Sequence, residues 1–171
     1  MDLRPTADRL RETLFNVLTP GNPAALEKTV WIDLYAGTGA VGIEAISRGA
    51  GMVYFVELAS KSVNAIHQNL RSLDLNAGFE VLQQDAVRAL RTLELKSVAA
   101  DFVFLDPPYE LAQAYHNTLE ALADSSLLKP GSIVVAEHLK RFDPGEEFNA
   151  LRRYRKLEQS NAALSFYRKE K

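Results

Sequence analysis

The sequence predicts an α/β fold, in which a doubly wound, mainly parallel, Rossmann-like sheet carries helices on both faces. Two observations lead to this prediction. Short apolar runs alternate with segments of helical periodicity along most of the chain, and a glycine-rich loop follows the first of these runs. A third observation completes the sheet: the last two runs are joined by a short turn, so we expect seven strands that end in an antiparallel hairpin.

Five of the strands are predicted to be parallel, because runs that are apolar on both faces are typical of strands covered by helices. Apolar residues at helical spacing, as in residues 60–74, predict helices between these runs. The hairpin is expected at residues 150–159 and 162–170, whereas residues 129–132 and 140–148 have the composition of a turn and a loop. The five parallel strands are predicted at residues 29–35, 52–57, 79–85, 100–106 and 132–138.

The chain is predicted to form one domain over residues 1–171, with an N-terminal helix and loop at 1–28 and the catalytic core at 29–171. The helix is amphipathic from Thr6 to Leu18, and Thr6 is a candidate N-cap. This organisation leaves no interdomain linker, and we expect a monomer.

The composition excludes several classes of protein. None of the apolar runs approaches the roughly 20 residues that cross a bilayer, and the charged N-terminus has no signal-peptide pattern. Cysteine is absent, which excludes disulfides, thiolate catalysis and cysteine-ligated metals, and the three histidines are too scattered to predict a metal site. We therefore expect a cytoplasmic protein without a metal.

The net charge of −2 does not indicate a globally basic nucleic-acid-binding protein, but the C-terminal part of the chain is positive. Residues 138–171 contain nine Lys or Arg and five Asp or Glu. Solvated strand edges would explain this pattern as well as contacts to phosphates would. The candidate RNA-binding residues are Arg152, Arg153, Arg155, Lys156 and Arg168.

The loop after the first strand contains Gly37, Gly39 and Gly42 in a G-x-G-x-x-G pattern. Glycine permits a tight turn and a close approach of the backbone to a ligand. A dinucleotide or S-adenosyl-L-methionine would suit this pattern, and so would a plain turn between a strand and a helix. Asp33 lies just before the loop, where a carboxylate would repel a pyrophosphate and attract a ligand that carries an ammonium and a sulfonium.

Carboxylates follow or end the first four predicted strands, and parallel strands bring such ends to one crevice. Glu57 lies twenty residues after Gly37, where a carboxylate can accept hydrogen bonds from a ribose diol. Asp85 is placed to meet an adenine or, equally, to cap the helix that follows it. Four acids at one edge of a sheet are not needed for folding, which indicates a functional site.

The stretch Asp106, Pro107, Pro108 and Tyr109 follows the fourth strand. The prolines stiffen the backbone and carry no N–H, which leaves carbonyl and carboxylate acceptors beside an aromatic ring. Acceptors and a stacking surface suit the exocyclic amino group of a nucleobase that has been turned out of its helix. We predict that these four residues are catalytic.

These motifs make the chain similar to the RsmD family of S-adenosyl-methionine-dependent 16S rRNA guanine-N2 methyltransferases. The similarity is carried by "LRPTADRLRETLFNVL", "DLYAGTGAVGIEAISRGA", "FVE" and "FLDPPY", and it extends over essentially the whole chain. Family members usually have a short basic, glycine-rich segment before the first motif, where this chain has only Met1, Asp2 and Leu3. That difference bears on affinity for RNA and leaves the cofactor site unaffected.

The resemblance implies transfer of a methyl group from S-adenosyl-L-methionine to guanine N2 in 16S ribosomal RNA, of the guanine-966 type. Because the sequence shows no target-recognition domain beyond the catalytic core, RNA within the assembling small subunit is a hypothesis for the substrate beside naked RNA. Arg4 and Thr6 would lie near the methionine end of the cofactor, although both also suit the entry of a helix. The cofactor-binding residues implied in this way are Arg4, Thr6, Asp33, Tyr35, Ala36, Gly37, Thr38, Gly39, Glu57, Leu58, Asp85 and Ala86.

Three alternatives remain open at this point. The glycine loop and the DPPY motif are also typical of adenine-N6 methyltransferases that act on DNA or RNA. The same glycine spacing, together with Glu57, suits a nicotinamide-dependent oxidoreductase. The positive C-terminal hairpin is also consistent with a non-catalytic RNA-binding module.

Overall fold

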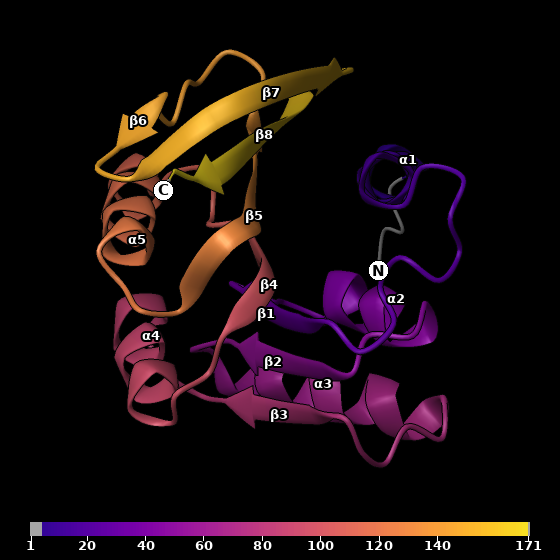
Figure 1. Ribbon diagram of the computed structural model, residues 1–171. Coiled ribbons are helices and arrows are strands. Elements are labelled where there is room, and N and C mark those ends of the chain that lie inside the picture. Colours follow the sequence, from indigo (N-terminus) through magenta and orange to yellow (C-terminus); the bar gives the residue numbers. More distant parts are fainter. Residues whose placement is uncertain (1–4, 171) are drawn as a thin grey trace.

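The computed structural model describes residues 5–170 as one mixed sheet with helices on both faces (Figure 1). The sheet has eight strands in the order β3-β2-β1-β4-β5-β8-β7-β6. The first five in this order are parallel, and the last three are antiparallel to their neighbours. The strands are β1 (Val30–Leu34), β2 (Met52–Val56), β3 (Phe79–Leu82), β4 (Ala100–Leu105), β5 (Leu128–Leu139), β6 (Glu147–Phe148), β7 (Leu151–Gln159) and β8 (Ala162–Lys169).

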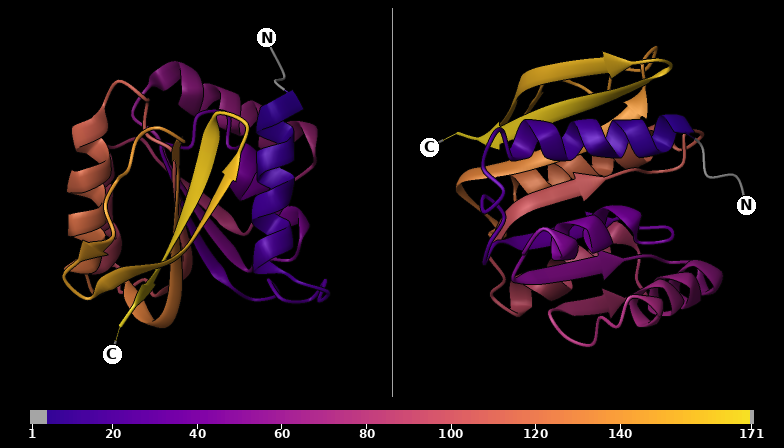
Figure 2. Two further views of the ribbon diagram at one scale, coloured as in Figure 1. Left: turned by 90° about the horizontal axis from the view of Figure 1, so that it is seen from above. Right: turned by 90° about the vertical axis from the view of Figure 1, so that its right-hand side faces the viewer.

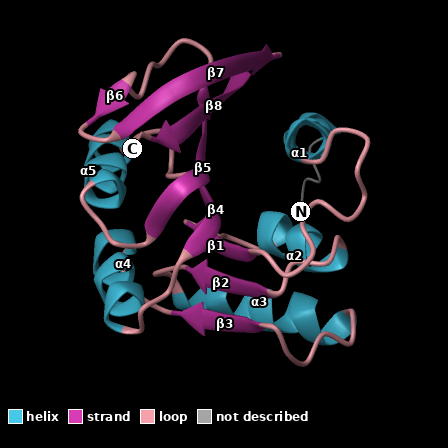
Figure 3. Ribbon diagram, viewed as in Figure 1, coloured by secondary structure: helices cyan, strands magenta, loops and turns pink. Residues whose placement is uncertain are grey.

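Helix α1 precedes β1, each of the other four helices connects two parallel strands, and together they cover the sheet on both sides (Figure 2). Helices α1, α2 and α3 pack on one face, and α4 and α5 pack on the other. This arrangement confirms the predicted doubly wound fold and its C-terminal hairpin, which is clear in Figure 3. The helices are α1 (Pro5–Leu18), α2 (Ala40–Ser47), α3 (Ser60–Ser72), α4 (Ala86–Leu95) and α5 (Ala112–Ala123).

Each face of the sheet has its own apolar cluster, because strand residues alternate between the two sides. On one side Trp31 stacks between Phe15 of α1 and Phe102 of β4, at centroid distances of 5.4 and 4.8 Å. On the other side Tyr115 and Leu119 of α5 are buried against β4 and β5. Helix α1 therefore packs against the same sheet as the other helices.

Three local predictions differ from the structure. An eighth strand, β6, forms within the segment predicted as a loop, because Phe148 is buried and pairs with Leu151. Strand β5 already begins at Leu128, so the predicted turn at 129–132 is an irregular part of that strand, with Gly131 at φ +94°. Thr6 lies inside α1 rather than at its N-cap, since the helix begins at Pro5.

Among residues 5–170, no helix has both the length and the hydropathy needed to cross a membrane.

Candidate active site

A cavity of about 890 Å³ opens at the carboxyl ends of the parallel strands, the edge at which ligands bind in open α/β sheets. The whole predicted DPPY stretch lines this cavity, together with residues from the loops after β1, β2 and β3. The predicted residues that line it are Tyr35, Gly37, Glu57, Leu58, Asp85, Ala86, Asp106, Pro107, Pro108 and Tyr109. The structure thus brings residues as far apart in the chain as Tyr35 and Tyr109 to one place.

Four predicted cofactor residues within the described part of the chain, Asp33, Ala36, Thr38 and Gly39, do not line the cavity. Ala36, Thr38 and Gly39 belong to the same loop as Gly37 but are not part of the wall. Arg4 lies outside the described residues, and the side chain of Thr6 is not described.

Two glycines of the loop have different surroundings: one lies beside open space and the other is packed against the core. Gly37 has φ +58°, and a Cβ atom added there would have no neighbour within 4 Å, so the loop leaves open space above it. At Gly42 a Cβ atom would lie 2.3 Å from Cε1 of Phe55, because α2 packs directly on β2 there. Gly37 therefore faces the cavity, whereas Gly42 is required for packing between helix and strand.

Glu57 follows β2, and backbone amides hold both of its carboxylate oxygens. Oε1 accepts a hydrogen bond from the Gly37 amide and Oε2 accepts one from the Ala59 amide, each at 2.9 Å. A carboxylate oxygen can accept more than one hydrogen bond, so both oxygens retain capacity toward the cavity. The backbone therefore presents a fixed pair of acceptors, which is the geometry that recognition of a diol requires.

Asp33 is fully buried inside β1 and does not line the cavity. Its Oδ2 accepts a hydrogen bond of 3.0 Å from the Gly42 amide, so it serves as an acceptor for the first turn of α2. Burial, assisted by the nearby charges of Glu57 and Glu137, raises the pKa of Asp33 to about 8. Asp33 is thus a buried acid with a raised pKa beneath the glycine loop, and not an exposed carboxylate beside the loop.

The third strand is followed by Asp85, whose side chain accepts a hydrogen bond from the Arg88 amide at 3.3 Å and so caps α4. The capping alternative for this residue is confirmed. The neighbouring Gln84, which was not predicted as a site residue, also lines the cavity, and its buried Oε1 atom has no hydrogen-bond partner in the described structure. A buried acceptor without a partner has an energetic cost for the folded protein.

The DPPY stretch rests on Tyr115 of α5. The Tyr115 hydroxyl donates to the carbonyl oxygen of Glu137 at 2.7 Å and lies 3.4 Å from the carbonyl oxygen of Pro107. Tyr115 is almost fully buried, and burial raises the pKa of its hydroxyl well above the usual value. A rigid, un-ionised tyrosine therefore supports the turn, while Tyr109 extends to the cavity with 44% of its surface exposed.

Glu137 is a second acid at this place that the sequence analysis did not select. It lies on β5, one residue beyond the pair Leu105–Ala136, and therefore beside Asp106. The two side chains hydrogen-bond, and burial and their mutual charge raise the pKa of Asp106 well above its usual range. Burial raises the pKa of Glu137 to about 7. Glu137 could have been predicted from the sequence, because it lies near the carboxyl end of a predicted parallel strand, as the other acids do.

A family model described as "Conserved hypothetical protein 95" matches residues 1–168 of the chain. The chain belongs to this family. Its curated relatives confirm the resemblance to the RsmD family. "Putative rRNA methyltransferase YlbH" of Bacillus subtilis is 31% identical over 166 residues, covering 97% of this chain and 88% of the relative. "Ribosomal RNA small subunit methyltransferase D" of Haemophilus influenzae is 35% identical over 136 residues, covering 79% of this chain and 67% of the relative.

The fold of this family member is also found in a solved structure named "Putative methyltransferase yhhF" from Escherichia coli. The TM-score is 0.81 at 25% identity, covering 98% of this chain and 88% of the other. The similarity therefore extends across all the elements that build the cavity.

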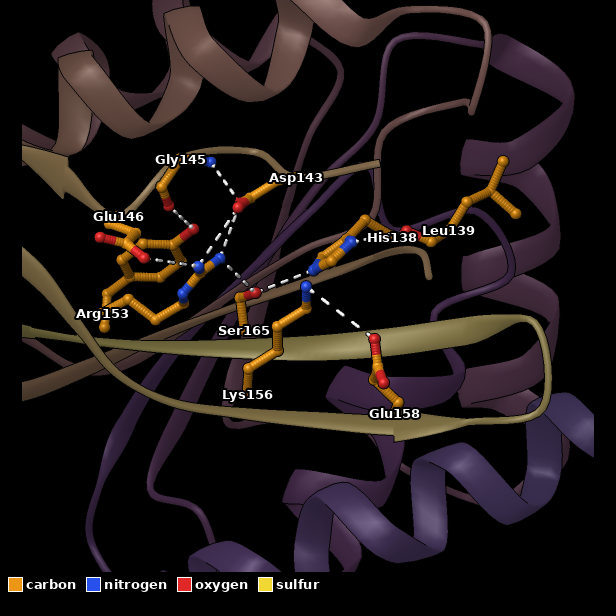
Figure 4. A network of polar contacts seen from close by, with 10 residues as sticks. His138, Leu139, Asp143, Gly145, Glu146, Arg153, Lys156, Glu158 and Ser165 are labelled. Atoms are coloured by element: carbon orange, nitrogen blue, oxygen red, sulfur yellow. Dashed lines mark hydrogen bonds and ion pairs between the residues drawn. The ribbon is translucent and has the colours of Figure 1, made fainter. Parts of the chain in front are cut away.

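The basic residues predicted to bind RNA are not gathered at the cavity. Arg153 has only 10% of its side chain exposed, because it pairs with Asp143 at 2.8 Å and with Glu146 at 3.5 Å (Figure 4). Its guanidinium also donates to the Ser165 hydroxyl, which in turn hydrogen-bonds with His138. This network fastens the segment after β5 to the hairpin.

The other basic side chains of the hairpin are more exposed. Arg152 forms ion pairs of 3.0 Å with both Glu147 and Glu170. The guanidinium of Arg168 lies 4.1 Å from the ring centroid of Tyr154, a cation–π contact. The two residues not yet placed, Arg155 and Lys156, are exposed on β7.

Proposed function

We propose that the protein transfers a methyl group from S-adenosyl-L-methionine to the exocyclic N2 of a guanine in 16S ribosomal RNA, in the cytoplasm. Guanine 966 is the expected position. The observation that carries the proposal is the meeting of Glu57 and Asp106 in one cavity. One of these carboxylates is held for a diol, and the other lies beside a proline-stiffened turn and an aromatic ring.

The cavity fits the cofactor in three respects. Gly37 leaves open space over the loop, and Glu57 offers two fixed acceptors to the ribose. Leu58 is 64% exposed at the cavity wall, an apolar surface that a purine ring would cover. When bound, the cofactor supplies a methyl group that is already activated by a positively charged sulfonium.

The charge of the site supports this cofactor over a nicotinamide dinucleotide. Four acids, Glu57, Asp85, Asp106 and Glu110, line the cavity, and none of its described lining residues is Lys or Arg. A pyrophosphate would be repelled at such a site, whereas an ammonium and a sulfonium would relieve the repulsion among the carboxylates. The curated relatives reported above are named methyltransferases, in agreement with this argument.

The protein's own contribution to the reaction is to position the amine and to accept its proton. Asp106 and the Pro107 carbonyl accept hydrogen bonds from the two N–H groups, which orients the nitrogen lone pair toward the methyl group. As the nitrogen gains a methyl group it must lose one proton, and the carboxylate of Asp106 is placed to receive it. Tyr109 stacks on the base that has been turned out of the RNA.

Guanine suits this arrangement better than adenine. Guanine presents N1–H beside its N2 amino group, so one carboxylate can accept from two neighbouring donors. Adenine presents the N1 acceptor beside its amino group, and a carboxylate there would meet one donor and one acceptor. The acidic pair of Asp106 and Glu137 therefore supports the guanine proposal.

The test is methylation of small ribosomal subunits and of naked 16S rRNA from a strain that lacks the gene, followed by mass spectrometry of the nucleosides. We expect N2-methylguanosine with the wild-type protein and no transfer with Asp106→Ala, which should still bind the cofactor. Glu120→Gln, an exposed change on α5, is the matched control. N6-methyladenosine as the product would support the adenine alternative, and full activity of Asp106→Ala would refute the mechanism.

A further inference from the structure

The sheet order divides the active-site edge into two halves. The residues assigned to the cofactor follow β1, β2 and β3, and the reacting residue Asp106 follows β4. Strand β5 is the neighbour of β4 on the side away from β1. The carboxyl end of β5, where the chain continues into Lys140 and Arg141, therefore borders Asp106 on the side away from the cofactor residues.

The turn after β5 holds Lys140 and Arg141 in fixed positions. The Lys140 amide donates to the Asn161 carbonyl at 2.8 Å, and the Phe142 amide donates to the Leu139 carbonyl at 3.1 Å. The Phe142 ring packs on Tyr115 at a centroid distance of 5.1 Å. Since Tyr115 also supports the DPPY turn, the basic turn and the reacting residues share one rigid anchor.

Both side chains are available to a partner. Lys140 and Arg141 are exposed, and neither forms an ion pair with a carboxylate in the described part of the chain. They border a hollow of about 430 Å³ that also includes Glu158, whose carboxylate lies 4.0 Å from the ammonium of Lys156. With that acid partly compensated, the turn is a local positive site.

A positive site is needed at this place because the cavity itself is acidic. The carboxylates on its wall would repel the phosphates that flank an entering base, and the affinity of proteins for nucleic acids depends mainly on cations that meet phosphates. Two arginines of the hairpin, Arg152 and Arg168, are poorly placed for this purpose. Arg152 pairs in register with Arg168, and Arg168 with Ile133, which lies four residues before Glu137, on the side away from the carboxyl end of β5.

We propose that Lys140 and Arg141 form a phosphate-binding element that holds the RNA backbone next to the target base. The inference rests on the proposed function, since it takes RNA as the substrate. It assigns the main contact to the turn after β5, whereas Arg152 and Arg168 at the other end of the hairpin contribute little.

Binding of naked 16S rRNA to the full chain, measured at several salt concentrations without methyl transfer, tests this proposal separately from the reaction. The double variant Lys140→Ala with Arg141→Ala should bind about tenfold more weakly at physiological salt. Its slope of log K against log salt should fall by about 1.4, because each lost single-strand phosphate contact contributes about 0.7. Cofactor affinity, measured by calorimetry, should equal that of the wild type, which also shows that the variant is folded.

The matched control is Arg152→Ala with Arg168→Ala, which removes the same charge from the far end of the hairpin. We expect this variant to retain the wild-type slope and affinity. The proposal is overturned if the control variant loses affinity and the Lys140–Arg141 variant does not, or if the wild-type protein fails to bind RNA. A wild-type protein that binds RNA but transfers no methyl group would count against the proposed function and leave the binding comparison valid.

Discussion

Asp106 and Glu137 lie side by side at the carboxyl ends of β4 and β5, and their carboxyl groups hydrogen-bond beneath the cavity. Two partly buried acids that share a hydrogen bond oppose each other's ionisation, so the pKa of each is raised. Burial makes the largest contribution to the raised pKa of Asp106, and the charges of Glu137 and then of Asp33 add to it. Glu137 is therefore the neighbouring charge that affects the pKa of Asp106 most.

Glu137→Gln should shift the pH dependence of methyl transfer. Loss of the Glu137 charge lowers the pKa of Asp106, so the carboxylate form that accepts the amine persists to lower pH. The acidic limb of the kcat profile should therefore move toward lower pH. The measurement is single-turnover methylation of small subunits between pH 5.5 and 9, with Glu120→Gln as control. An unmoved acidic limb in Glu137→Gln would contradict this role.

Glu57→Gln should weaken cofactor binding. The amide keeps one acceptor, but its NH₂ group must face either the Gly37 or the Ala59 amide, so a donor meets a donor. We expect an affinity at least about tenfold lower, equivalent to roughly 1.4 kcal/mol, in calorimetry with S-adenosyl-homocysteine. Glu80→Gln on β3, an exposed acid paired with Lys96, should bind normally. Equal affinities for both variants would remove Glu57 from the ribose site.

Cofactor binding should release protons. The pKa of Asp33 is raised to about 8 and that of Glu137 to about 7, so this cluster is partly protonated at pH 7.5. A positively charged ligand favours the ionised carboxylates and lowers these pKa values, which frees protons. Calorimetry in buffers of different ionisation enthalpy should show release of on the order of one proton, and less with S-adenosyl-homocysteine, which lacks the sulfonium charge. Net proton uptake would contradict the prediction.

Asp33→Asn should stabilise the fold at alkaline pH. The folded pKa of about 8 exceeds the unfolded value of 3.8, so between these values the folded state binds more protons and stability falls as pH rises. The asparagine can still accept the Gly42 hydrogen bond but carries no charge. Its unfolding free energy at pH 8 should exceed that of the wild type by on the order of 1–3 kcal/mol, measured with urea.

At a pH well below 3.8 the difference between Asp33→Asn and the wild type should nearly vanish, because both the folded and the unfolded wild type then hold the proton. The exposed Asp74→Asn is the control and should not alter the pH dependence. An Asp33→Asn protein that is less stable at pH 8 would show that the charge of Asp33 is favourable in the fold.

The sequence predicts those parts of the fold and site that depend on local pattern. Apolar runs locate the parallel strands, and the rule that ligands meet at strand ends selects Glu57 and Asp106, which the structure brings to one cavity. The contacts between side chains of different strands depend on strand pairing, which local sequence pattern does not predict. Glu137 lies beside Asp106 because of the register in which β4 pairs with β5. Arg153 is largely buried because the pairing of β7 in the sheet brings it next to the segment that carries Asp143.

Asp33 shows the same limit at the level of a single side chain. Its place before the glycine loop is visible in the sequence, but whether the carboxylate faces the ligand or the helix depends on packing of α2 against β1. The structure turns it toward Gly42, inside the protein.

The most direct test of the proposed cofactor site is a crystal structure of the protein with S-adenosyl-homocysteine. We expect the ligand in the cavity between Gly37 and Asp106, with its ribose hydroxyls on Glu57, its adenine beside Leu58 and Gln84, and its sulfur facing the DPPY turn. A ligand bound at another place, or one that leaves Glu57 without a contact, would contradict it.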